Sequence, residues 1–126
     1  MDGKKPMQFI KREIKPQEIE IAGQKYPAIY NFNAIATMED YTETAHSFTL
    51  SRLSIGACTA KEFIGCLHGM LSAAGVEVEP ETLAENIDPE EEKAIFDQML
   101  KIIRDQSPDP KNSKNALPPE SSTGTN

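Results

Sequence analysis

The sequence predicts an α+β fold, in which an N-terminal β-hairpin is followed by a small bundle of three to four helices. Residues 18–21 alternate apolar and polar positions, as a half-buried strand does, and a glycine separates them from a second predicted strand that ends at Tyr30. Beyond Asn33 apolar residues recur at helical spacing, in segments that open with capping residues. The pattern is flanked by a charged stretch and by a Pro/Ser/Asn-rich stretch. We therefore expect a basic arm of low order over residues 1–16, a single α+β domain over 17–106 and a disordered tail over 107–126.

The hairpin is predicted from a period of two. Isoleucine alternates with glutamate over residues 18–21. Gly23 and Gln24 are expected to form the turn, because glycine adopts positive φ at little steric cost. In the second strand one face carries Tyr26, Ala28 and Tyr30.

The first helix should follow at once, capped by Asn33 or Asn31 and carrying an apolar stripe through Ile35 and Met38. The next segment, 48–57, is harder to interpret. Its apolar residues must be covered, but its serines and Gly56 weaken a helix. We expect an irregular packed connection or a short helical turn, in which other residues cover the apolar side chains of Phe48, Leu50, Leu53 and Ile55.

Three further helices are predicted from their ends. Thr59 and Glu62 have capping-box spacing, and Gly75 stands where that helix should end. Residues 80–87 form a short helix that begins with a proline. Asp88 should cap the last helix in a second capping box with Glu91. On the Thr59 helix two glycines spaced four apart leave a smooth face, expected to pack on the hairpin, at Gly65 and Gly69.

Charge and composition exclude several functional classes. The chain has 126 residues and a formal net charge of −7, which argues against nucleic acid as a partner. Basic residues cluster before residue 16, whereas 77–97 is strongly acidic. This asymmetry suits a basic partner, although an acidic, solvated face is the more usual explanation. No apolar run reaches membrane-spanning length, so no membrane is expected. The two cysteines are expected to be reduced thiols in a cytoplasm.

The candidate reactive residues do not form a convincing site. Cys66 and His68 lie two apart on a predicted helix and therefore point to different faces, and only Cys58 and His46 could join them. The simplest interpretation is a buried thiol beside a surface histidine. We predict no catalytic, cofactor-binding or metal-binding residue, and no enzymatic activity.

The hairpin-to-helix run carries a resemblance to a known family. Its pattern, G-x-x-Y, an extended segment and N-x-x-A-hydrophobic, is formed by Gly23, Tyr26, Ile29, residues 31–35, Met38 and Glu39. This pattern resembles the N-terminal signature of tail assembly chaperones of long-tailed (siphovirus-like) phages. The likeness extends over about residues 17–106, through the helix at 59–75, the acidic segment 79–87 and the amphipathic helix 89–104.

The resemblance implies a non-enzymatic chaperone that binds and solubilises the tape-measure protein during tail morphogenesis. Such proteins act in the host cytoplasm and are absent from the mature virion. The tail-tube protein and a second copy are further partners to consider, and a frameshifted longer form is common in the family. We expect partner contacts from adaptable apolar side chains, although a core position is the more usual role for the methionines: Tyr26, Tyr30, Met38, Met70, Phe96 and Met99. The alternative function is a small acidic phage or prophage adaptor that regulates a host protein.

Overall fold

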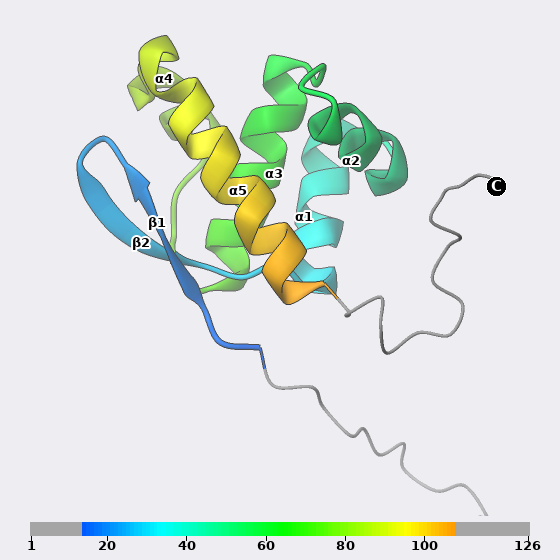
Figure 1. Cartoon of the computed structure of the whole chain (residues 1–126), viewed down its shortest axis with the longest axis horizontal. Helices are drawn as coiled ribbons and strands as arrows, with labels where there is room; N and C mark the ends of the chain where they lie inside the picture. The colour runs from blue at the N-terminus through cyan, green and yellow to red at the C-terminus, as the bar shows by residue number, and fades with distance from the viewer. Residues whose placement is uncertain (1–13, 108–126) are drawn as a thin grey trace, which may run out of the picture.

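The computed structural model describes residues 14–107, and this part has the predicted α+β architecture. The elements are β1 (Gln17–Ile21), β2 (Gln24–Ala28), α1 (Phe32–Thr42), α2 (His46–Ser54), α3 (Ala60–Ala73), α4 (Pro80–Asn86), the 3-10 turn η1 (Pro89–Glu91) and α5 (Glu92–Gln106). Figure 1 shows the hairpin to one side of the helices, with α5 crossing in front of α3 and α1. Within the described range there are five α-helices rather than three to four, because α2 forms where an irregular connection or a short helical turn was expected. The predictions for residues 1–13 and 108–126 lie outside the described residues.

The hairpin turns one residue earlier than predicted. Ile21 pairs with Gln24, so the turn consists of Ala22 and Gly23, with φ of 53° and 81°. A two-residue turn with positive φ at both positions matches the twist of the flanking strands, which explains why Gln24 belongs to β2. Ile19 is fully buried on the inner face of this hairpin.

The core lies between the hairpin, α1, α3 and α5, and its tightest contact joins α1 to α3. A Cβ added at Gly69 would lie 2.4 Å from the carbonyl oxygen of Ala34, and one at Gly65 would lie 2.6 Å from Cγ2 of Thr42. The smooth glycine face therefore packs on α1, and the expectation that it packs on the hairpin was wrong. The absence of two side chains lets the two helix backbones approach closely.

The helix ends follow the capping predictions in part. Thr59 and Glu62 form the expected capping box, and Asn31 rather than Asn33 caps α1 by accepting the Ala34 N–H. The capping box expected between Asp88 and Glu91 at the start of the last helix does not form as predicted. Asp88 accepts the N–H of Glu90 at 2.9 Å and caps η1, so α5 itself begins only at Glu92.

Both edges of the hairpin are closed to a further strand. On the β1 edge, Gln98 of α5 accepts the Glu20 N–H at 2.8 Å and donates to the Glu20 carbonyl at 3.0 Å. On β2, the pairing register turns Pro27 toward the outer edge, where it removes a donor. This arrangement prevents the two-stranded sheet from acting as a template for an added strand. Among residues 14–107, no helix is both long and apolar enough to cross a bilayer.

Candidate partner-binding surface

The structure separates the six predicted contact residues into two groups. Tyr30, Met38, Met70 and Met99 are buried, with exposed fractions of 8, 1, 0 and 0%. They pack in the core, and burial raises the pKa of the Tyr30 hydroxyl to about 12. Tyr26 and Phe96 are half-buried at the margin of the core. Only these last two therefore have surface to offer a partner in this structure.

Three large apolar side chains that were not among the predicted contacts are exposed instead. They are Phe32, Phe48 and Ile55, with exposed fractions of 78, 61 and 75%. The expectation that Phe48 and Ile55 are covered was wrong, although Leu53 is fully buried and Leu50 half-buried. The sequence did contain an indication that some of these residues are exposed, because a nine-residue helix with serines on several sides cannot bury every apolar residue it carries.

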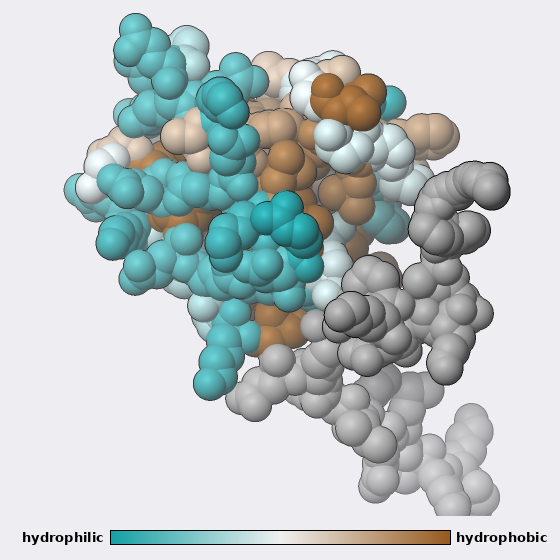
Figure 2. Space-filling model, viewed as in Figure 1, coloured by the Kyte–Doolittle hydropathy of each residue, from teal (hydrophilic) through white to brown (hydrophobic). Residues whose placement is uncertain are grey.

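The exposed Ile55 adjoins an apolar region between the α2–α3 connection and α5, because the next residue, Gly56, lines a hollow there together with Phe96. On α5, residues four and three apart form a half-buried flank beside the core stripe: Phe96, Leu100 and Ile103. A shallow hollow of about 290 Å³ joins this flank to the α2–α3 connection, with Phe96 on one side and Gly56 and Cys58 on the other. Figure 2 shows brown and tan side chains gathered along α5 on its α2 side and at the tip of the connection. We give the name α2–α5 surface to the exposed Phe48 and Ile55, seven positions apart on one side of α2, together with the α5 flank of Phe96, Leu100 and Ile103.

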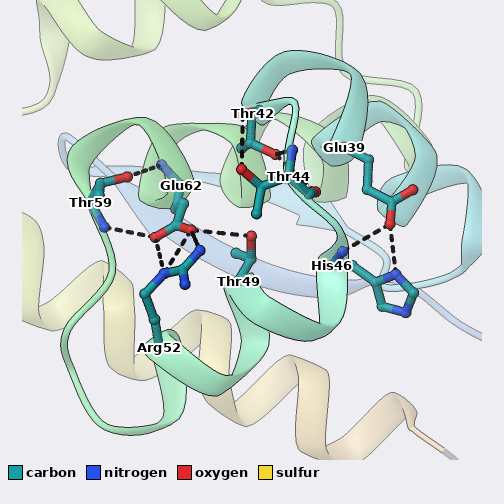
Figure 3. A network of polar contacts seen from close by, with 8 residues as sticks. All are labelled: Glu39, Thr42, Thr44, His46, Thr49, Arg52, Thr59 and Glu62. Atoms are coloured by element: carbon teal, nitrogen blue, oxygen red, sulfur yellow. Dashed lines mark hydrogen bonds and ion pairs between the residues drawn. The ribbon is translucent and has the colours of Figure 1, made fainter.

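Helix α2 is positioned by a buried carboxylate at the start of α3. Glu62 is 4% exposed and lies at the centre of the network in Figure 3. Arg52 donates from Nε to both carboxylate oxygens at 3.0 and 2.9 Å and from Nη2 to Oε2, and Thr59 donates its N–H at 2.9 Å. The Arg52 guanidinium hydrogen bonds lower the pKa of Glu62 to about 2. Glu62 thus caps α3 and anchors α2 at the same time.

The first turn of α2 is anchored to α1 by a second carboxylate. Glu39 accepts the backbone N–H of His46 at 2.8 Å, and the same oxygen lies 2.7 Å from Nδ1 of the imidazole (Figure 3). These bonds lower the pKa of Glu39. Because Ala45 offers no side-chain cap, the Glu39 carboxylate takes the place of a capping residue for α2. The two anchors together fix the orientation of Phe48 and Ile55.

The cysteines and histidines do not assemble a reactive centre. Burial raises the pKa of the Cys66 thiol to about 12, and its Sγ contacts Sδ of Met70 at 3.9 Å. Burial also raises the pKa of Cys58, so neither thiol is poised as a thiolate at neutral pH. The residues described by the structure contain no group of three or more His, Cys, Asp or Glu side chains that could hold a metal ion.

Searches against protein-family models, curated proteins and solved structures returned no match for the chain.

Proposed function

We propose that this chain is a phage tail assembly chaperone that binds the tape-measure protein through the α2–α5 surface. One observation carries the proposal: Phe48 and Ile55, seven positions apart and so on one side of α2, are 61 and 75% exposed. Large apolar residues exposed on one side of a helix are typical of protein-binding sites, because leaving them in water is unfavourable. The resemblance of the hairpin-to-helix run supplies the identity of the partner.

The shape of the surface favours a helical partner. Its apolar side chains come from α2 with its C-terminal end and from α5, and Phe96 lines a shallow hollow rather than a deep cavity. A helix can lay an apolar face along such a surface, with contacts repeating every three or four residues. A long, partly apolar helical protein would be protected from aggregation at each segment covered in this way.

The edges of the surface are polar and charged. Glu92, Lys93 and Asp97 line the hollow together with Phe96, and Lys93 pairs with Asp97 at 3.0 Å. An apolar centre with a charged rim is the usual organisation of a reversible protein interface. This polarity suits a chaperone that must release its partner when the tail tube assembles around it.

The test is co-expression with the tape-measure protein encoded nearest to this chain. We expect the chain to keep the tape-measure protein in the soluble fraction and to copurify with it. The double variant Phe48→Ser/Ile55→Ser should lower the affinity by about tenfold or more, the loss typical of central interface residues. The matched control is Phe32→Ser, which alters a still more exposed phenylalanine at the start of α1 and should bind as the unaltered chain does.

Two results would contradict the proposal. One is a tape-measure protein that is equally soluble with and without the chain. The other is a host protein, rather than the tape-measure protein, that copurifies and is lost in the Phe48→Ser/Ile55→Ser variant. That second result would support the acidic adaptor function instead.

A further inference from the structure

A second apolar groove lies away from the α2–α5 surface, between the hairpin and α4. It has a volume of about 370 Å³ and is lined by Ile21 and Tyr26 of the hairpin, by Leu71, Val76 and Val78, and by Leu83 of α4. A volume of this size falls within the range of about 300–1,000 Å³ found for ligand sites. The groove is therefore large enough to receive apolar side chains.

The rim of this groove is strongly acidic. Residues 77–85 contain four carboxylates and no basic side chain. Glu77 lines the groove itself, and Glu79, Glu81 and Glu85 are exposed beside it. An occupant that fits should combine apolar side chains with positive charge.

One segment of the chain has this composition. Residues 2–13 contain three large apolar residues, four basic residues and only two acidic ones. Residues 14–107, in contrast, contain 16 acidic and 7 basic residues, a net charge of −9. The N-terminal segment is thus the part of the sequence whose charge is opposite to that of the groove.

The N-terminal segment is also long enough to reach the groove between the hairpin and α4. It joins the hairpin directly before β1, and the far end of β1, Ile21, lines the groove. The path from Ile14 to Ile21 is seven residues long and spans at most about 23 Å at ~3.3 Å per residue. The seven residues back from Ile14 to Met7 can span the same distance. A fold-back along the hairpin can therefore bring Met7 to Ile21 and Phe9 to Tyr26, which pairs with Ile19.

We propose that residues 4–12 of the same chain occupy the groove between the hairpin and α4. Met7, Phe9 and Ile10 supply the apolar contacts, and the flanking basic residues face the carboxylates of the rim.

Photo-crosslinking in the full-length chain tests this directly. Benzoylphenylalanine at position 9 keeps an aromatic ring there, and irradiation should join it to residues 71–87 within one chain, as located by mass spectrometry. The crosslink yield should fall severalfold between 0.05 and 1 M salt, since the Debye length shortens from more than 10 Å to about 3 Å. It should also fall by about fivefold or more in Glu77→Lys/Glu79→Lys, which reverses two rim charges.

The matched control is Asp40→Lys/Asp97→Lys, which changes the net charge equally but alters no residue that lines the groove. This control should crosslink as the unaltered chain does. If the variant Glu77→Lys/Glu79→Lys fails to fold, the salt titration of the crosslink in the chain without these two substitutions still tests the proposal. Crosslinks between two chains would overturn the proposal in favour of a second copy as the occupant. Crosslinks outside residues 71–87, or none, would overturn it altogether.

Discussion

Two helices that follow one another, α2 and α3, are attached to the molecule by different kinds of interaction. Nine of the fourteen residues of α3 are buried, among them Phe63, Leu67 and Met70. Only Thr49 and Leu53 are buried among the nine residues of α2, which is anchored mainly by the carboxylates of Glu39 and Glu62. Apolar burial fixes α3 as part of the core, whereas polar anchors leave α2 free to present apolar residues to solvent. The comparison separates the side chains that stabilise the fold from those available for binding.

The largest difference should appear on truncating one apolar residue in each helix. Leu67→Ala in α3 should lower the free energy of unfolding by about 3 kcal/mol, because Leu67 is fully buried and its loss leaves a cavity. Phe48→Ala in α2 should change it by less than about 0.5 kcal/mol, because Phe48 is mostly in water. Urea unfolding followed by circular dichroism measures both. Equal losses would show that α2 is as much a part of the core as α3.

The next effect concerns the close contact between α3 and α1. Gly69→Ala should destabilise the protein by about 2 kcal/mol, because a Cβ there would meet the backbone carbonyl of Ala34. This cost exceeds the gain of about 1 kcal/mol from replacing glycine by alanine in a helix. Gly65→Ala is the matched control and should cost less, since the nearest atom belongs to the side chain of Thr42. Thermal unfolding would contradict the prediction if Gly69→Ala raised the melting temperature.

A smaller effect is expected from the anchor of α2. Glu62→Gln should lower the free energy of unfolding at pH 7 by about 1–2 kcal/mol, because a buried charge-assisted hydrogen bond to Arg52 is weakened. Folding depresses the pKa of Glu62 from 4.5 to about 2, so its contribution is complete above pH 4.5 and is lost as the pH falls toward 2. The gap between the unaltered chain and the variant should close over that range. A gap that stays constant down to pH 2, or an equal loss in the exposed control Glu81→Gln, would contradict this role.

The smallest effect on stability should come from the proposed binding residues. Phe48→Ser/Ile55→Ser should change the free energy of unfolding by less than about 0.5 kcal/mol while it weakens partner binding. Denaturant unfolding and copurification, measured on the same preparation, separate the two properties. A large loss of stability would show that these side chains support the fold rather than a partner.

The sequence predicted the hairpin and α3 well because their signals are local. Alternation around Gly23 and the capping box of Thr59 and Glu62 each involve residues a few positions apart. Helix α2 was not predicted with equal clarity because its anchors are tertiary, joining Arg52 to a carboxylate ten positions later. A local pattern gives no indication that these two side chains meet.

The candidate site was predicted only in part, for a related reason. Methionines and tyrosines at regular spacing have the same pattern in a core and on a binding face, and the structure places Met38, Met70 and Met99 in the core. Phe48 and Ile55 lie in segment 48–57, whose hydrophobic periodicity could not be assigned to a helix or to a strand. Their exposure follows from the small buried face of α2, which becomes evident only in three dimensions.

The glutamines of α5 have a consequence for the order in which the protein can fold as it is synthesised. Gln106, the last residue of α5, accepts the Tyr30 N–H at 2.6 Å and donates to the Lys15 carbonyl at 3.0 Å, a separation of 76 and 91 positions along the chain. The Tyr30 N–H and the Lys15 carbonyl therefore gain these hydrogen bonds only once the last helix is in place. On a ribosome the hairpin would emerge early but reach its final form late, after almost the whole domain has left the exit tunnel. Such long-range closure slows folding relative to a bundle of local contacts.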